Sequence, residues 1–483
     1  MREDDQSYFE EPEFKASLEK YEDACRNGMP IYMDADELTD IAEYYMTRRQ
    51  ESRANEAISL AVLLHPQSVD PQIFLARQEM FRGNLEEAQR ICDAIVDQND
   101  REVVFLKAEL LIRNEQPEKA CSVMEEALEE QDSDPVLFLY DCACVLMDYS
   151  LWDEAMEWTE RVLNLQPDHN GALLLKAEIM VMTGYNDEAI EILNSLLDQD
   201  PYNTSAWNFM GEAQCNLEHY QEAMECAEYV LAINEKNRQA MVIKANCLFH
   251  LDHIEEAHEM YKAALNEYAE DDIVCYLDAV CLINLNRYEE ASEMLDRANE
   301  ISGGMSREQF EIYMQQAHVE NQLHNVDKAI NAVNNARKII PASVGFEYEF
   351  LMGHIYLENQ CYEKAKKFFD RAIKLSKDKP GTVRLIGISL TDCKLYKEAM
   401  DVLGLMLAVF GDDPARSIRP HLAYCCYQLQ EYEKFLLHLK EAISLNREDT
   451  IRFFSPLYPN VPPEEYYLYA FKSVYGRFPE EDE

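Results

Sequence analysis

A repeat of about 34 residues constrains the fold of this chain more than any other feature. Each copy carries Gly or Ala, then Ala twelve positions later, and then apolar residues four and seven positions beyond that alanine. The second alanine recurs at intervals of 32 to 38 residues, and Phe435 takes its place in the last copy. The alanines at this position are Ala54, Ala88, Ala120, Ala155, Ala189, Ala223, Ala257, Ala291, Ala329, Ala365 and Ala399.

Only glycine or alanine occurs twelve positions before each of these residues. Small residues let two antiparallel helices approach closely, and the large apolar residues beside them fill the flanks of the contact. The pattern therefore predicts an all-α solenoid of about twelve helix pairs over residues 35–449. The small residues are Ala42, Ala76, Ala108, Ala143, Ala177, Gly211, Ala245, Ala279, Ala317, Gly353, Gly387 and Ala423.

Composition agrees with a helical, folded chain. There are only 14 glycines and 17 prolines in 483 residues, and the 47% hydrophobic share is enough for a core. The 92 acidic residues outnumber the 44 basic ones, and the net charge of −48 would repel phosphate backbones and anionic lipids. We therefore expect no nucleic-acid partner and no membrane insertion. The chain shows neither a signal peptide nor a spanning apolar run, which predicts a cytoplasmic protein.

The repeat resembles the tetratricopeptide-repeat (TPR) family, and in particular its long arrays of bacterial type. Trp207, Met210, Gly211, Tyr220 and Ala223 match the family pattern within one repeat. The resemblance implies a right-handed solenoid that binds proteins or peptides and seldom catalyses a reaction. Prolines occupy the closing position of the family pattern at Pro66, Pro167, Pro201 and Pro341.

Two longer spacings and the chain ends divide the predicted array. The spacings before Ala329 and Ala365 imply extended helices or turns near residues 301–306 and 340–345. Gly303 and Gly304 would permit a hinge, although a longer loop between repeats is the preferred interpretation. The predicted divisions are an N-terminal arm or capping helix at 1–34, repeats one to eight at 35–305, repeats nine to twelve at 306–449, and an aromatic C-terminal capping segment at 450–483.

Both ends of a solenoid expose an apolar face that must be covered. Phe9, Phe14 and Leu18 recur at helical spacing, so a helix there is predicted to cap the first repeat. Residues 450–483 are dense in Phe and Tyr, and Pro462–Glu465 favours a helix start. We expect this segment to cap the last repeat, while docking of a partner or of a second copy remains the alternative.

The resemblance also implies a binding surface, because fixed positions on the first helix of each repeat line the TPR groove. The ninth position is mainly acidic in the front half of the array, and neighbouring positions add aromatic side chains. The Lys and Asn set of the carboxylate-clamp TPRs is missing, which disfavours chaperone tails as ligands. The predicted protein-binding groove comprises Glu43, Arg77, Phe105, Glu109, Tyr140, Glu178, Asn208, Phe209, Glu212, Asn246, Tyr276, His318, Phe350 and His354.

A groove of carboxylates and aromatic rings suits a segment that carries Lys or Arg together with apolar anchors. The alternative is that the acids only keep the chain soluble, since Glu86, Glu87 and others lie at helix starts, where the macrodipole favours them. We predict a non-catalytic scaffold or adaptor that binds a protein or peptide. Self-assembly through the aromatic tail, and a role as regulatory subunit of an enzyme complex, remain alternatives.

No motif for catalysis or cofactor binding stands out. The chain has no Walker loop, nucleophile elbow, His-Glu-x-x-His or Rossmann fingerprint, so neither an enzyme nor a cofactor is predicted. His318 and His354 occupy equivalent positions in adjacent repeats, where polar contacts are expected rather than a metal. The 14 cysteines show no recurring metal spacing and are predicted to be reduced core residues.

Overall fold

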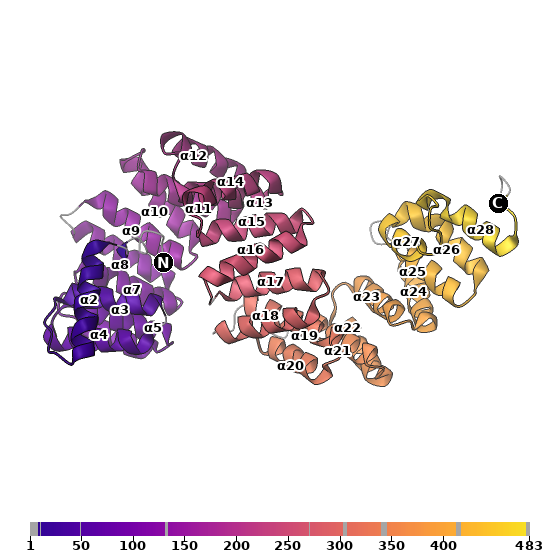
Figure 1. The fold of residues 1–483 in the computed structure, drawn as a ribbon, viewed down its shortest axis with the longest axis horizontal. Coiled ribbons are helices and arrows are strands. Elements are labelled where there is room, and N and C mark those ends of the chain that lie inside the picture. Colours follow the sequence, from indigo (N-terminus) through magenta and orange to yellow (C-terminus); the bar gives the residue numbers. More distant parts are fainter. Residues whose placement is uncertain are drawn as a thin grey trace. The chain divides into compact units, whose positions relative to one another are not determined.

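The computed structural model describes residues 8–9, 11–48, 50–130, 134–269, 271–302, 307–339, 345–411 and 417–479. Every regular element within these ranges is a helix (Figure 1). Twelve antiparallel pairs run from α3/α4 to α25/α26, preceded by α2 and followed by α27, η3 and α28. The predicted all-α solenoid of twelve helix pairs is therefore confirmed.

The chain divides into two compact units, Met1–Ile233 and Asn234–Glu483. The first contains α2 Pro12–Asn27, α3 Ala35–Thr47, α4 Glu51–Leu64, α5 Val69–Phe81, α6 Leu85–Ala94, α7 Arg101–Arg113, α8 Pro117–Glu130, α9 Pro135–Asp148, α10 Trp152–Leu165, α11 Asn170–Thr183, α12 Asn186–Gln199, α13 Thr204–Asn216 and α14 Tyr220–Ile233. The second contains α15 Arg238–His250, α16 Ile254–Glu267, α17 Asp272–Asn284, α18 Tyr288–Ile301, α19 Arg307–Gln322, α20 Val326–Ile339, α21 Gly345–Glu358, α22 Tyr362–Leu375, α23 Lys379–Asp392, α24 Tyr396–Phe410, α25 Arg419–Gln428, α26 Tyr432–Leu445, α27 Arg447–Phe454, η3 Pro463–Glu465 and α28 Tyr466–Tyr475.

All of the small residues predicted at the helix crossings are buried. The clearest case is Gly387 of α23, where an added Cβ would overlap the side chain of Leu403 on α24. Leu403 lies four residues after the packing alanine Ala399, which is the register that the repeat predicts. Close approach of the two helices in this pair therefore depends on the missing side chain.

Gly387→Ala should lower the free energy of unfolding by about 1–3 kcal/mol, because Leu403 must leave its rotamer to admit the methyl group. Gly404→Ala in the same pair is the matched control, since nothing lies within 4 Å of its added Cβ. That change should raise stability by up to about 1 kcal/mol, because alanine favours a helix interior over glycine. Urea unfolding measures both, and effects of the same sign would contradict the close approach.

Among the described residues, the turn between the two helices of eleven pairs contains a residue in the left-handed region. It always lies five positions before the packing residue, and φ ranges from 57° to 88°. The sequence analysis did not identify this position, because only two of its occupants are glycine. They are Gly83, Glu115, Ser150, Gly184, Glu218, Asp252, Asn286, His324, Gln360, Lys394 and Gln430.

Helix α2 covers the first repeat, as predicted. Phe14 and Tyr21 are each 4% exposed and pack in one cluster with Leu38 and Ile41 of α3. Polar contacts fix the same interface, because the Ser17 hydroxyl donates to Glu37 at 2.8 Å and the Tyr45 hydroxyl donates to Glu22 at 3.1 Å.

The C-terminal segment covers the last repeat in the same manner. Phe454, Tyr466 and Phe471 are buried in a cluster with Phe435 and Leu439 of α26. Phe435 therefore replaces the usual alanine at a position where aromatic rings from the cap surround it. The prediction of capping helices at both ends is confirmed.

The longest spacing between repeats comes partly from an extended helix. α19 has 16 residues and α17 has 13. α18 packs against α19, and the Ser292 hydroxyl donates to Glu320 across this contact at 2.7 Å. Residues 303–306 and 340–344, where joints were predicted, lie outside the described residues, so the hinge stays a prediction. The two compact units divide at 233/234, and the predicted division between repeats eight and nine stays a prediction.

Nine of the 14 cysteines are buried. Burial raises the pKa of the Cys142 thiol, which disfavours the reactive thiolate. Cys25 and Cys361 are exposed, so the prediction that every cysteine is a core residue was wrong for them. Both lie at helix ends, where the buried face is interrupted. No helix within the described ranges has the length and apolar character needed to cross a membrane.

Candidate binding site

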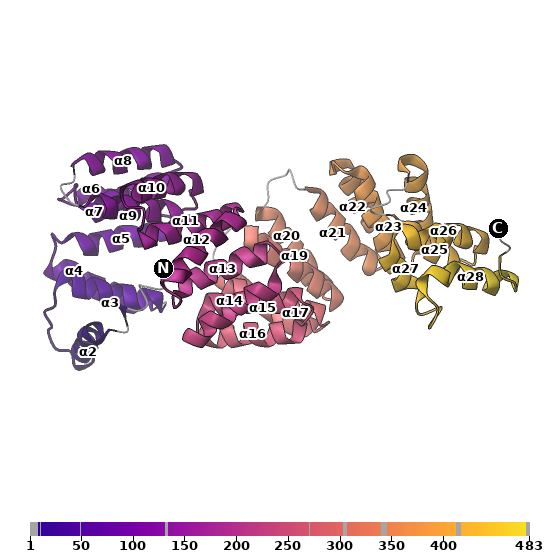
Figure 2. The ribbon, with the colours of Figure 1, turned by 90° about the horizontal axis from the view of Figure 1, so that it is seen from above.

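A cavity of about 630 Å³ lies at the start of the first unit. Its walls come from α3, from α5 and from Tyr8 and Phe9, which precede α2. α3 and α5 are the first helices of pairs one and two and pack against each other, and Figure 2 shows α2 beside α3. Glu43 and Arg77, two residues of the predicted groove, therefore line one hollow. The lining also includes Met46, Phe74 and Phe81.

The apolar part of the cavity is aromatic. Phe81 ends α5 and is 82% exposed, an unusual state for a ring of that size. Phe74 is nearly buried, while Phe9 packs on Phe14 and Tyr44 with ring centroids 4.9 and 5.5 Å apart. An exposed ring beside an ordered aromatic wall is a suitable seat for one apolar side chain of a partner.

The polar part of the cavity is acidic. Asp40 and Glu43 project from α3 into the lining. Asp40 accepts a hydrogen bond from the Tyr8 hydroxyl, and that bond raises the pKa of Tyr8 to about 12. Burial raises the pKa of the Asp40 carboxyl above its ordinary value. The half-buried carboxylate of Asp40 and the exposed carboxylate of Glu43 would favour a cationic group beside them.

Arg77 is the one cation among the lining residues, and carboxylates of α7 hold it. Its Nη2 lies 2.8 Å from Oε1 of Glu109, and its Nε lies 3.3 Å from Oε2 of the same carboxylate. Glu102 lies 3.6 Å from the guanidinium. Glu109 is thus partly neutralised, and its side chain is only 12% exposed. The predicted role of Glu109 as a carboxylate for a basic ligand is weakened, while that of Glu43 stays a prediction.

The other predicted groove residues of the first unit lie at different depths. Phe105 is 4% exposed because it stacks on Phe138 of α9, with ring centroids 5.5 Å apart. Asn208 is fully buried in α13. These two predictions need correction, since neither side chain offers surface to a ligand. The half-buried members are Tyr140, Glu178, Phe209 and Glu212.

In the second unit, the predicted groove residues lie in two places. Asn246 and Tyr276 belong to α15 and α17, whereas His318, Phe350 and His354 belong to α19 and α21. Asn246 accepts from the Tyr261 hydroxyl, and burial raises the pKa of Tyr276. Farther along, Phe350 and His354 stack with ring centroids 6.4 Å apart. Burial lowers the pKa of His318.

His354 also contacts two residues that the sequence analysis did not single out. Its Nε2 lies 3.3 Å from Oε1 of Glu358, and its Nδ1 hydrogen-bonds with Ser389 of α23. His318 adds a Coulombic contribution to the lowered pKa of Glu358, which depends chiefly on the His354 contact. Among the described residues, no group of three His, Cys, Asp or Glu could hold a metal ion.

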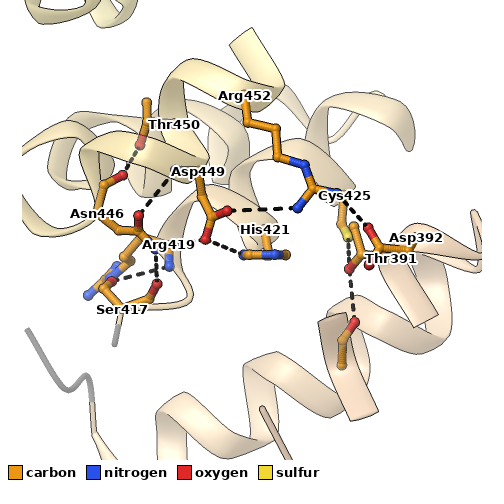
Figure 3. Close-up of polar contacts among 11 residues, drawn as sticks. Thr391, Asp392, Ser417, Arg419, His421, Cys425, Asn446, Asp449, Thr450 and Arg452 are labelled. Carbon is orange, nitrogen blue, oxygen red and sulfur yellow. Dashed lines mark hydrogen bonds and ion pairs between the residues drawn. The ribbon is translucent and has the colours of Figure 1, made fainter. Parts of the chain in front are cut away.

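A polar network joins α23, α25 and α27 at the C-terminal end (Figure 3). His421 is 2% exposed, and its Nδ1 lies 3.8 Å from Oδ2 of Asp449. Arg452 bridges Asp449 at 3.9 Å and Asp392 at 3.4 Å. Neither ring nitrogen of His421 makes a hydrogen bond, and burial lowers its pKa to about 4. The network joins the cap to the last pairs, and His421 is buried within it.

Two family models match parts of the chain. The model described as anaphase-promoting complex, cyclosome, subunit 3 matches residues 148–226 and 218–298, and a tetratricopeptide-repeat model matches residues 350–379. No curated protein matches the sequence.

Several solved structures are similar in fold. A tetratricopeptide repeat protein from Parabacteroides merdae ATCC 43184 is 15% identical, with a TM-score of 0.40, over 56% of this chain and 99% of its own. The APC/C hetero-tetramer Cut9–Hcn1 is 13% identical, with a TM-score of 0.36, over 89% and 96%. A human IFIT1 dimer with PPP-AAAA is 14% identical, with a TM-score of 0.47, over 86% and 95%. At these identities the likeness concerns the fold alone.

Proposed function

Because the chain is a tetratricopeptide-repeat protein, we propose that it is a non-catalytic scaffold that holds a segment of a partner protein in the cavity between α3 and α5. The family fold supports a protein-interaction scaffold. The finer assignment of a binding place and a ligand rests on the cavity at the start of the first unit.

One observation carries this assignment: the exposed ring of Phe81, the half-buried carboxylate of Asp40 and the exposed carboxylate of Glu43 share one hollow. Phe81 and the Phe9 wall would accept an apolar side chain, and Asp40 with Glu43 would face a Lys or Arg of the same segment. Arg77 pairs with Glu109 by hydrogen bonds and interacts electrostatically with Glu43, so the cavity holds one cation beside the two carboxylates of α3. The proposed ligand is therefore a short segment with one apolar anchor next to a basic residue.

Phe81→Glu should abolish retention of the partner that wild type retains, because a charged side chain would replace the apolar seat. Leu63→Glu is the matched control, since Leu63 is 76% exposed on α4 and lies outside the cavity lining. The measurement is affinity purification with mass spectrometry. A peptide from the partner's bound region is then titrated by fluorescence anisotropy.

The charge of the ligand is tested with Glu43→Lys in the same titration. We expect this change to lower the affinity for the partner peptide on the order of tenfold, and we expect the wild-type affinity to fall as salt rises, because the Glu43 carboxylate is exposed to screening. Equal recovery of the partner with Phe81→Glu and with Leu63→Glu would refute the cavity as the binding place. If the affinity changes neither with salt concentration nor on Glu43→Lys, the proposal of a basic ligand is refuted.

A further inference from the structure

Charge is distributed unevenly along this acidic chain. Residues 1–233 contain 51 acidic and 16 basic residues, a net charge of −35, whereas residues 234–483 contain 41 and 28, a net charge of −13. Within the second half, residues 362–379 reverse the sign, with seven basic and three acidic residues. These residues include α22, the second helix of its pair. By contrast, α18, which is also the second helix of its pair, has five acidic residues and one basic residue.

The basic residues of α22 lie along one ridge of the helix. Lys364, Lys367, Arg371 and Lys374 follow one another at intervals of three, four and three residues, which is the spacing of side chains on one helical face. All four are exposed. The ridge is about 15 Å long at 1.5 Å per residue. It runs the length of the helix, so attraction to the negative C-terminal end of the dipole does not explain it.

Aromatic rings of α21 and α22 form a floor beside this ridge. Tyr356 and Phe368 stack with centroids 5.4 Å apart. Nζ of Lys364 lies 5.0 Å from the centroid of Tyr356, and the Arg371 guanidinium lies 4.4 Å from that of Phe368. These distances are typical of cation–π contacts, so the floor holds the charges in place.

The floor continues onto α20. The guanidinium of Arg337 lies 4.7 Å from the ring centroid of Tyr348, and the Tyr348 hydroxyl donates to Asn334 of α20 at 3.2 Å. α20, α21 and α22 are packed in sequence, as Figures 1 and 2 both show. Cations of two helices therefore share one surface, which we call the cationic surface. It consists of Arg337, Lys338, Lys364, Lys367, Arg371 and Lys374.

Most of this positive charge is not neutralised within the described part of the chain. Arg371 makes an ion pair with Glu349 at 3.4 Å, and the Lys338 ammonium donates to the neutral side chain of Asn335 at 2.9 Å. Among the described residues, no carboxylate lies within ion-pair distance of the ammonium groups of Lys364, Lys367 and Lys374. Three exposed ammonium groups in a strongly acidic protein are thus available to an external anion.

We propose that the cationic surface is a docking site for a short acidic segment of a partner protein, with carboxylates on the lysine ridge and an apolar side chain against the Tyr356–Phe368 floor. The ridge matches about five extended residues or three helical turns. This surface is separate from the cavity of the first unit and prefers the opposite charge, so the proposal does not depend on the proposed function.

A short segment fits better than a long polyanion. Charges beyond the Debye length of about 8 Å are largely screened at physiological salt, so a short segment would sense mainly the cationic surface. A nucleic acid or an anionic membrane would extend over neighbouring surface of a chain whose net charge is −48. The rings also favour a ligand that has apolar side chains as well as charge.

The test measures binding of the full chain to a fluorescein-labelled twelve-residue peptide in which glutamates flank two phenylalanines. Fluorescence anisotropy gives the affinity. Lys364→Glu/Lys367→Glu/Lys374→Glu should weaken binding on the order of tenfold or more, and wild-type affinity should fall with rising salt. The matched control is Lys20→Glu/Lys119→Glu/Lys262→Glu, which changes net charge equally at exposed sites on other helices. Lys364→Gln/Lys367→Gln/Lys374→Gln removes the charges but keeps polar side chains, so its loss of affinity should lie between those of wild type and the glutamate variant.

Equal losses in the ridge variant and in the control variant would overturn the proposal, because they would reflect net charge alone. Tighter binding of a twelve-nucleotide oligothymidine, or of vesicles containing phosphatidylserine, to the same ridge would also overturn it. The same holds if sedimentation shows self-association of wild type that the ridge variant loses, since the occupant would then be a second copy. Circular dichroism confirms that each variant remains helical.

Discussion

Phe454→Ala should lower the free energy of unfolding of the last repeats by about 3–5 kcal/mol. The Phe454 ring is fully buried, with centroid distances of 5.8 Å to Phe435 and 6.3 Å to Tyr424. Its removal would leave a cavity where α25, α26 and α27 meet. Since a solenoid repeat is stabilised chiefly by its neighbours, the loss should be local. Hydrogen exchange of peptides from α25 to α28, with urea unfolding, measures it.

The matched control is Tyr469→Ala on α28, whose side chain is 40% exposed. It should change stability by less than about 0.5 kcal/mol, because it removes little buried surface. Equal effects of the two changes, or unchanged exchange of α25–α28 in Phe454→Ala, would contradict the assignment of this segment as a cap. The pair of variants therefore separates capping from a docking role for the exposed aromatic residues of the tail.

The number and register of the helix pairs could be predicted because the small residues act directly on the geometry. At Gly387 the neighbouring helix has no room for a side chain, so the sequence at that position reports the packing itself. The same reasoning applies to Phe435, the exception among the packing residues. Its ring lies against Phe454 of the cap, with centroids 5.8 Å apart.

The turns show where such reasoning ends. The left-handed position is glycine at Gly83 and Gly184, but it is Glu115, Glu218 or Lys394 in other repeats. A non-glycine residue in that conformation costs about 1–2 kcal/mol, which the packing of the two flanking helices can offset. Because the cost is small, the amino acid at this position is not fixed, and the turn leaves no clear pattern.

The candidate site was only partly predictable, because family positions state which side of a helix a residue occupies and not how deep it lies. Phe105 has a groove position, yet Phe138 from the next repeat covers its ring. Arg77 and Glu109 are in successive repeats, and their pairing depends on the spacing of α5 and α7. Phe9 reaches the cavity from outside the repeats, where no repeat pattern applies.

His421 illustrates the same limit for buried polar groups. It lies two positions before the small residue Ala423, where the repeat pattern makes no demand. Its burial depends on Phe453 of the cap, whose ring lies edge-on with centroids 4.9 Å apart. An imidazole without hydrogen bonds is tolerated there because it remains neutral, and its charged form would lack adequate solvation.

Acidification should destabilise the C-terminal end through His421. Burial lowers its folded pKa from the ordinary 6.5 of a histidine to about 4, so the folded state binds the proton more weakly than the unfolded state. The stabilisation is fully present above pH 6.5 and is lost as pH falls toward about 4. The shift corresponds to about 3 kcal/mol across that window. Urea unfolding between pH 7.5 and 4.5, with hydrogen exchange of α25–α28, measures the slope.

His421→Asn isolates this contribution, because the amide is polar, of similar size and does not titrate in this window. The groups facing His421 are Asp449, whose charge favours imidazolium, and Arg452 and Arg384, whose charges oppose it. Asp449→Asn should therefore lower the folded pKa further and steepen the loss below pH 6.5. His318, whose pKa burial also lowers, is retained in both variants and cancels in the comparison. If His421→Asn and wild type lose stability in parallel between pH 6.5 and 4.5, the buried imidazole is not the source of the acid sensitivity.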